Sequence, residues 1–228
     1  MVEYMRVVLI ILMAVITPFL MSFSDSSRVS SYADIDKNYS EVTDDPLIVK
    51  ALDSMDGTTG EYSKKAILGF NLTAKPVKIY FKNLGEINPG YASFDALGWR
   101  NSNQLYIYIN NKHRNSPPEA LGSLLSHEAV HQDQYNSLDE ETIAWTLEAK
   151  VWLEMKERNP DIAKFKSELV IRENTLGGML KDASYNNRLI RAQVEGNSGY
   201  FGLPQHTDTL KDKIKFLPVS LLDSGMFN

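Results

Sequence analysis

Two short segments of the chain alternate between hydrophobic and polar residues. In residues 77–82 (VKIYFK) every second residue is apolar, and in residues 105–109 (LYIYI) aliphatic residues alternate with tyrosines. A period of two places successive side chains on opposite faces of a β-strand. Each segment is therefore predicted to be a strand with one buried face, and Asn110 and Asn111 end the second strand.

Longer segments carry the spacing and boundary residues of helices. Residues 45–55, 62–70, 138–158 and 161–194 are predicted to be helical, the last with a break at the glycine pair 177–178. A further helix is expected to begin with Ser116 as its cap, ahead of two prolines, and to continue beyond residue 131. A small sheet followed by helices predicts an α+β fold with a helical C-terminal part.

The first residues differ from the rest of the chain. Residues 7–23 (VVLIILMAVITPFLMSF) form an apolar run that suits either a short membrane span or the core of a secretory signal. We expect residues 1–23 to be a signal peptide or membrane anchor, residues 24–44 a flexible stalk, and residues 45–228 the folded domain. Both interpretations place that domain across a membrane, either anchored through the N-terminal segment or secreted, in the periplasm or outside the cell.

Composition limits the chemistry available to this domain. The chain has 228 residues, a net charge of -5, four histidines and no cysteine. Without cysteine there is no disulfide and no thiolate metal ligand, so any metal must bind His, Asp or Glu. The charges are mixed along the chain without a basic run, which argues against nucleic acid as a partner.

Half of the histidines lie in one motif, His127-Glu128-Ala129-Val130-His131. Residues four apart share a face of a helix, so both imidazoles can bind one metal ion. Glu128 then lies beside the metal, where its carboxylate can accept a proton from a bound water. The motif predicts a zinc site with His127 and His131 as ligands and Glu128 as general base.

A catalytic zinc ion needs a third protein ligand. The candidates within reach are Asp133, Asp139, Glu140, Glu141, Glu148 and the distant His206. Residues 137–140 match a capping box, in which the side chain of Glu140 folds back on the amide of Ser137. That leaves Glu141 free near the start of the second helix, so we favour Glu141, with Glu140 and Glu148 as alternatives.

The motif at residues 127–131, followed by Glu141 and Ala144, resembles the gluzincin zinc metallopeptidases, in particular their small minigluzincin-like members. The resemblance implies a zincin-like fold in which two histidines and this glutamate bind Zn²⁺. It also implies that strand 105–109 is an edge strand above the cleft, to which a peptide or protein substrate adds as a further strand. One position differs, because Trp145 stands where the family commonly has the Asp or Asn that orients the first histidine.

Two functions follow as hypotheses. The resemblance implies hydrolysis of peptide bonds by a metal-activated water, with Glu128 as the base and a further donor for the oxyanion, for which Tyr135, Tyr200 and His206 are candidates. The alternative is a catalytically silent domain of the same fold that serves as an anchored binding module. Outside the site, His113 is expected to be an exposed loop residue and Asp133 part of a solvated helix end.

Overall fold

The structure is a computed structural model that describes residues 39–217. The signal or anchor predicted at residues 1–23 and most of the predicted stalk lie outside the described residues. No helix within residues 39–217 is long and apolar enough to cross a membrane. The described chain begins with a short 3-10 turn, Tyr39–Glu41, and the side chains of Tyr39 and Val42 are buried in the main core.

Three strands form one mixed sheet. They are β1 (Lys78–Lys82), β2 (Ala96–Asn101) and β3 (Gln104–Asn110), in the order β1-β3-β2. β1 pairs with β3 in parallel, and β2 pairs with β3 in antiparallel orientation. The strand predicted at residues 105–109 is therefore the central strand, and the expectation that it forms an edge is wrong. The edge strands are β1 and β2. The sequence of β2, ALGWRN, shows no regular alternation and contains a glycine, so the pattern does not reveal this strand.

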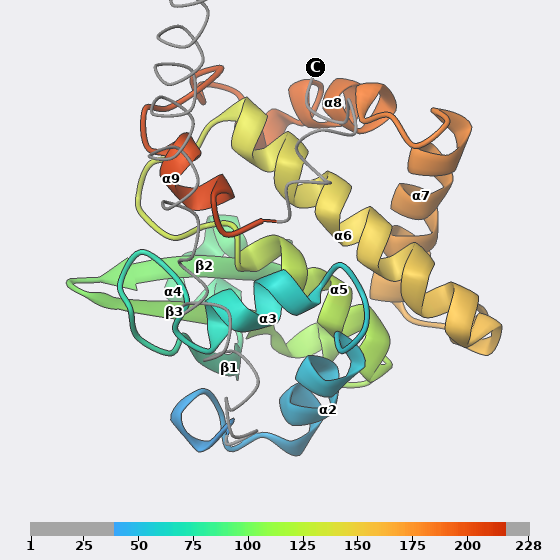
Figure 1. Cartoon of the computed structure of the whole chain (residues 1–228), viewed down its shortest axis with the longest axis horizontal. Helices are drawn as coiled ribbons and strands as arrows, with labels where there is room; N and C mark the ends of the chain where they lie inside the picture. The colour runs from blue at the N-terminus through green and yellow to red at the C-terminus, as the bar shows by residue number, and fades with distance from the viewer. Residues whose placement is uncertain (1–38, 218–228) are drawn as a thin grey trace, which may run out of the picture. The chain divides into compact units, whose positions relative to one another are not determined.

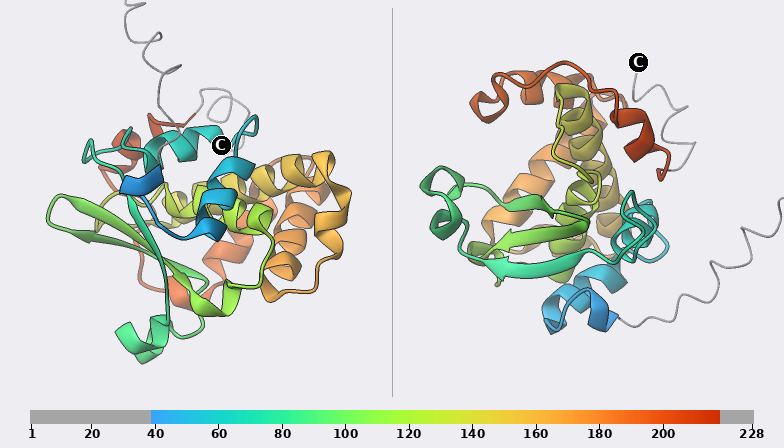
Figure 2. Two further views of the ribbon diagram at one scale, coloured as in Figure 1. Left: turned by 90° about the horizontal axis from the view of Figure 1, so that it is seen from below. Right: turned by 90° about the vertical axis from the view of Figure 1, so that its left-hand side faces the viewer.

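Eight α-helices occur within residues 39–217, and together with the sheet they confirm the α+β class. They are α2 (Pro46–Ser54), α3 (Glu61–Ile67), α4 (Leu84–Ile87), α5 (Pro118–Glu128), α6 (Leu138–Arg158), α7 (Glu168–Asp182), α8 (Arg188–Glu195) and α9 (Leu210–Ile214). α5 packs against α2 and α6, and α6 packs in turn against α7 and α8 (Figure 1). The sheet lies beside α5, as Figure 2 shows from two further directions.

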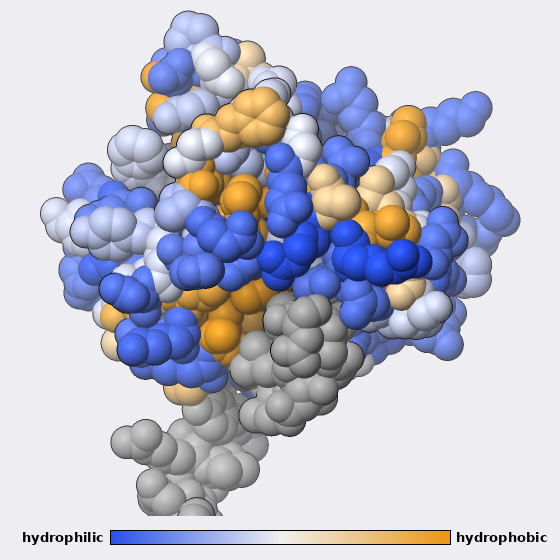
Figure 3. All heavy atoms as spheres, turned by 90° about the horizontal axis from the view of Figure 1, so that it is seen from above, coloured by the Kyte–Doolittle hydropathy of each residue, from blue (hydrophilic) through white to orange (hydrophobic). Residues whose placement is uncertain are grey.

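Buried aliphatic residues join the sheet to α5. Ile107 and Ile109 of β3 belong to one hydrophobic core with Leu121, Leu124 and Leu125 of α5. Because burial of these side chains removes apolar surface of both β3 and α5 from water, the contact holds α5 against the strands. On the surface seen in Figure 3, hydrophilic residues surround small groups of hydrophobic ones.

The helix boundaries test the predicted caps. The Asp45 side chain accepts a hydrogen bond from the amide of Leu47 at 2.9 Å, and Ser137 caps α6 by accepting from the amide of Glu140 at 3.2 Å. The predicted cap at Ser116 is wrong, because α5 begins at Pro118 without a side-chain cap and the Ser116 hydroxyl donates to Ser167 at 3.3 Å instead. The helix starts there because the proline pair itself favours the first turn.

The glycine pair 177–178 does not interrupt the helix in which it lies. α7 runs through both residues, so the predicted break is wrong; the chain instead leaves the helix after Asp182. A Cβ on Gly177 would lie 2.9 Å from Leu153 Cδ2 of α6, so this glycine allows the two helices to approach closely.

Gly122 of α5 gives a test of the packing that positions the motif helix. A Cβ there would lie 2.5 Å from Ser54 Oγ and 2.8 Å from the carbonyl oxygen of Ala51, both of α2. We expect Gly122→Ala to lower the free energy of unfolding by about 1–2 kcal/mol, since overpacking costs about 1–3 kcal/mol and helix propensity offsets up to about 1 kcal/mol. Urea unfolding followed by circular dichroism measures the change.

Gly178→Ala is the matched control, because a Cβ at that position meets no atom within 4 Å. Relief of glycine's conformational entropy should then raise the free energy of unfolding by about 0.5–1 kcal/mol. Equal stabilisation by both substitutions would show that α2 and α5 are not in the close contact described.

Candidate metal centre

The end of α5 brings the two motif histidines together. The α-helix ends at Glu128, and the motif closes in a tighter turn in which the amides of Val130 and His131 donate to the carbonyl oxygens three residues earlier, at 3.0 and 3.2 Å. The expectation that a regular helix continues beyond His131 is thus wrong. The turn nevertheless places Nε2 of His131 3.2 Å from Nε2 of His127, so both imidazoles face one point.

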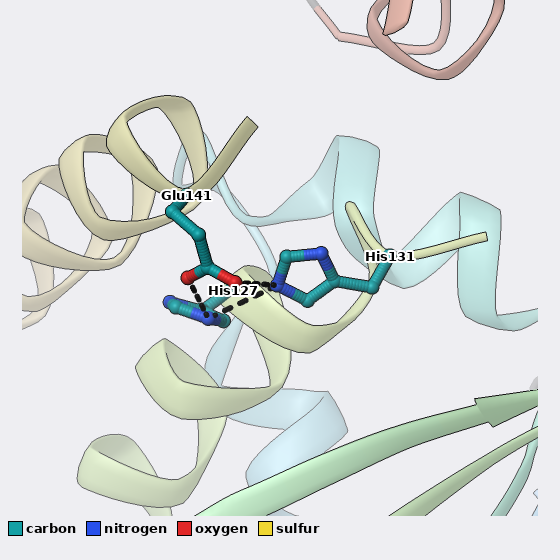
Figure 4. A group of neighbouring side chains, drawn as sticks. All are labelled: His127, His131 and Glu141. Carbon is teal, nitrogen blue, oxygen red and sulfur yellow. Dashed lines mark hydrogen bonds and ion pairs between the residues drawn. The ribbon is translucent and has the colours of Figure 1, made fainter. Parts of the chain in front are cut away.

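Glu141 completes the group from the first turn of α6. Its Oε2 lies 3.8 Å from Nε2 of His127, and its Oε1 lies 3.7 Å from Nε2 of His131. Figure 4 shows this carboxylate above the two rings. One ligand atom from each of the three residues falls within 4.8 Å of the others, so the group could hold a metal ion.

The other two candidate glutamates of α6 face the far side of the imidazoles. Glu148 Oε2 lies 3.0 Å from Nδ1 of His127, and Glu140 Oε1 lies 2.9 Å from Nδ1 of His131. The capping role expected for the Glu140 side chain is wrong, because the amide of Ser137 donates to Asn136 Oδ1 at 2.7 Å. Glu140 and Glu148 therefore orient the histidines, a common function of carboxylates around metal sites.

These contacts determine which ring nitrogen is available to a metal. Burial opposes the charge of Glu148, but the Arg172 guanidinium and His127 hold the pKa of that carboxyl at about 2. An ionised carboxylate only accepts hydrogen bonds, so Nδ1 of His127 must donate and its Nε2 carries a free lone pair in the neutral ring. Nδ1 of His131 faces the Glu140 carboxylate in the same way.

The two imidazole Nε2 atoms and the Glu141 carboxylate converge on one point, and their chemistry there shows whether a metal ion would fit. Nε2 of His131 and Nε2 of His127 lie 3.2 Å apart, a distance at which the two nitrogens can share one proton or bind one cation. Glu141 Oε2, at the same place, is buried and has no hydrogen-bond partner. Buried polar atoms are almost always satisfied, so an orphaned carboxylate oxygen beside two converging imidazole nitrogens fits a cation with nitrogen and oxygen ligands.

Electrostatics at the site follow from the same groups. Burial disfavours charge on His131, but the carboxylates of Glu141 and Glu140 outweigh it and raise the pKa of His131 to about 9. Burial also raises the pKa of Glu128 above its ordinary value, an effect that His127 and His131 partly oppose. For Glu141 the balance is reversed, because the two histidines outweigh burial and lower its pKa.

Only one of the three candidate oxyanion donors lies at the site. The Tyr200 hydroxyl accepts a hydrogen bond from Trp145 Nε1 at 3.1 Å, and burial together with the Glu141 charge raises the pKa of Tyr200. Tyr135 is 54% exposed, and the His206 side chain points to solvent beside Asp139. Trp145 thus positions Tyr200, a role that its sequence position did not suggest.

A cleft opens on both sides of this group. One cavity of about 490 Å³ extends from His127 and Glu128 towards Phe94, Arg172 and Tyr200. A second cavity of about 320 Å³ extends along β2 and the loop at residues 133–136, and it shares His127, Glu128 and Tyr200 with the first. Six residues line both cavities, these three together with Phe94, Ala96 and Gly199, and they stand where the two halves of the cleft meet.

β2 forms one wall of the cleft. A Cβ on Gly98 would lie 3.2 Å from His131 Cβ and 3.5 Å from Glu128 Oε2, so this glycine allows the strand to pass close to the motif. Gly98 is in register with Ile107 of β3, and the opposite edge of β2 has no partner strand within residues 39–217.

Two residues expected at the surface are buried instead. His113 is 1% exposed, and its Nε2 lies 2.7 Å from Asp95 Oδ1. Asp133 makes an ion pair with Lys213, whose Nζ is 2.6 Å from Asp133 Oδ1. Both expectations are wrong because the partners, Asp95 and Lys213, are distant along the chain and give no local signal.

No protein-family model matches this chain, and neither a curated protein nor a solved structure matches it. The site is therefore interpreted from its own geometry.

The raised pKa of His131 gives a pH-dependent prediction. A metal binds the neutral imidazole, so binding must displace the proton that His131 holds below about pH 9. Near pH 7 each bound metal ion should release about one proton from His131, and the apparent affinity should rise about tenfold per pH unit. Calorimetry in buffers of different ionisation enthalpy, on the Glu128→Gln variant, counts the protons without interference from Glu128.

An imidazole with the ordinary pKa of 6.5 would release almost no proton at about pH 8. Release that has ceased by that pH would contradict the described carboxylate environment. In the metal-free protein the raised pKa of His131 also affects stability. Protonated His131 stabilises the fold below pH 6.5, and this stabilisation is lost as the pH rises through about 9.

Proposed function

We propose that this chain is a zinc metallopeptidase of the gluzincin type. The observation that carries the proposal is the convergence of Nε2 of His127, Nε2 of His131 and the unpartnered Oε2 of Glu141, with the Glu128 carboxylate next to them. When bound there, zinc would supply a Lewis acid and lower the pKa of a water towards about 7. A set of two imidazoles and one carboxylate suits zinc and leaves a fourth position open.

Glu128 acts as the general base and acid in this proposal. Its Oε1 lies 4.0 Å from Nε2 of His127, and its side chain lines both halves of the cleft. There it accepts a proton from the attacking water and passes it to the nitrogen of the leaving amine. Burial raises the pKa of Glu128, which brings its basicity closer to that needed near neutral pH.

Tyr200 donates to the carbonyl oxygen as negative charge develops on it. The hydroxyl is oriented by Trp145 and lines both cavities beside Glu128. A preorganised donor in a water-poor cleft is effective because it does not have to reorient during the reaction.

The substrate is a peptide or protein segment in an extended conformation. Its backbone pairs with the free edge of β2, the strand that takes the place expected for residues 105–109. The closeness of Gly98 to the motif brings such a segment over Glu128 and His131. The apolar run at residues 7–23 favours an exported enzyme, membrane-tethered or secreted, and nucleic acid is not an expected partner.

The competing function is a silent domain that binds a partner without cleaving it. It requires neither a base nor an open cleft, whereas this chain has Glu128 buried against the histidines and a cavity on each side. We therefore favour the enzyme.

Substitution of the base and of the third ligand separates these functions. Glu128→Gln should keep about one zinc per chain but lose peptide hydrolysis by at least about 10²-fold, because only the proton acceptor is removed. Glu141→Ala should weaken zinc binding by about 100-fold or more, since loss of even an outer contact costs about 10–100-fold. Metal analysis and a peptide-library cleavage assay measure both.

The control is Glu168→Gln, whose carboxylate is 81% exposed and whose side chain lines neither half of the cleft. It should match wild type in both assays. Wild-type protein that binds zinc without cleaving any peptide would support the silent domain, and unchanged zinc affinity in Glu141→Ala would refute the ligand assignment.

Tyr200 is tested independently of metal binding. Tyr200→Phe should lower kcat by about 10²-fold with little change in KM or zinc content, because the donor acts mainly in the transition state. Tyr135→Phe alters an exposed tyrosine and should leave kcat unchanged. A fall in KM and kcat together, or none in either, would contradict the role of Tyr200.

A further inference from the structure

Lys213 is a buried cation at the edge of the metal centre. It belongs to α9, far from the motif in sequence, and its side chain is 0% exposed. Its Nζ lies 2.6 Å from Glu140 Oε2 and 2.6 Å from Asp133 Oδ1, and it also donates to the carbonyl oxygen of Tyr135. A lysine is almost never fully buried unless it is paired, so these contacts account for its position.

All three contacts of Lys213 lead to His131. Asp133 and Tyr135 belong to the loop that follows His131 and connects α5 to α6. Glu140 holds Nδ1 of His131 with one carboxylate oxygen and Lys213 with the other. A shift of Lys213 would therefore release both the loop and the carboxylate that orient this ring.

His127 is held by a similar arrangement on the other side of the site. Its partner Glu148 is paired with Arg172 of α7, with Nη2 of the guanidinium 2.9 Å from Oε2. Arg172 also contacts Glu173 at 3.2 Å and Asp95 at 3.3 Å, so several carboxylates determine its place. Each histidine is thus oriented by a buried carboxylate that is itself fixed by a cation from the C-terminal part of the domain.

We propose that Lys213 is a positioning residue of the metal centre, through which metal binding and the docking of α9 stabilise each other. The inference rests on the proposed zinc site. α9 has five residues, too few to be stable as an isolated helix. Its docking depends on Lys213 and on the packing of Leu210 and Ile214 against the core, so its position can respond to the metal. Coupling between two binding events is reciprocal. The free energy by which docked α9 strengthens metal binding, through a fixed Glu140, equals the free energy by which the bound metal strengthens the docking of α9.

Substitution of Lys213 measures one direction of this coupling. Lys213→Met keeps the length and apolar stem of the side chain but removes the cation. Zinc affinity, measured by competition with a chromophoric chelator, should fall by about 10–100-fold, the usual effect of disturbing a partner of a metal ligand. The control is Lys215→Met in the same segment, whose side chain is 55% exposed, pairs with Asp212 and lies over the Phe216 ring. It should bind zinc within about twofold of wild type.

Hydrogen exchange on the unmodified chain measures the reverse direction and does not depend on how well a variant folds. Zinc should slow amide exchange in residues 210–217 of wild type, whereas residues 188–195 of α8 serve as an internal reference. The zinc effect on residues 210–217 should disappear in His131→Ala.

The outcomes distinguish the inference from the proposed function. If wild type binds no zinc, the metal centre itself is wrong. If wild type binds zinc but Lys213→Met retains its affinity within about threefold, or exchange in α9 is indifferent to zinc, then Lys213 contributes only to stability and the inference is overturned.

Discussion

The burial of three carboxylates on α6 is the constraint on which the rest of this structure depends. Glu140, Glu141 and Glu148 are 1%, 4% and 0% exposed. An unpaired charge in such surroundings costs several kcal/mol, so each carboxylate must meet a cation or an N–H group. The two histidines of the motif contact all three glutamates. In addition, Arg172 of α7 pairs with Glu148, and Lys213 of α9 pairs with Glu140. The packing of α6 between α5 and the C-terminal helices is the geometry that brings these partners together.

The part of the site that could be predicted from the sequence is the part encoded by spacing along a helix. His127 and His131 are four residues apart, and Ser137 caps α6 at the predicted residue. Glu141 and Glu148 lie seven residues apart and so share a face, from which the role of Glu148 could have been inferred. The capping-box interpretation named the right residues but gave Glu140 the wrong partner, because a buried imidazole and a buried lysine bind that carboxylate more strongly than one backbone amide.

The parts that could not be predicted depend on contacts between residues distant in the chain. The order of strands in a sheet is one of them, since alternation within residues 105–109 does not tell which strands lie on either side. Lys213 is another, because it reaches the site from the loop-rich end of the chain. Tyr200 comes from the same end and was one of three candidate donors, but nothing local in the sequence singled it out. Trp145 illustrates the same limit. Its presence on α6 suggested that the residue that orients His127 is missing. In the structure Glu148, one turn further along, orients His127, and Trp145 orients Tyr200.

These contacts also bear on how the site is prepared for an ion. Both imidazoles are held at Nδ1 by carboxylates that have cationic partners of their own, so ring orientation does not require a metal. Glu141 Oε2 remains without a hydrogen-bond partner, and the raised pKa of His131 means that this ring holds a proton near neutral pH when no metal is bound. An ion entering such a site displaces a proton rather than reorganising side chains. The free energy needed to bring the ligands together is supplied during folding, by the ion pairs that α7 and α9 contribute.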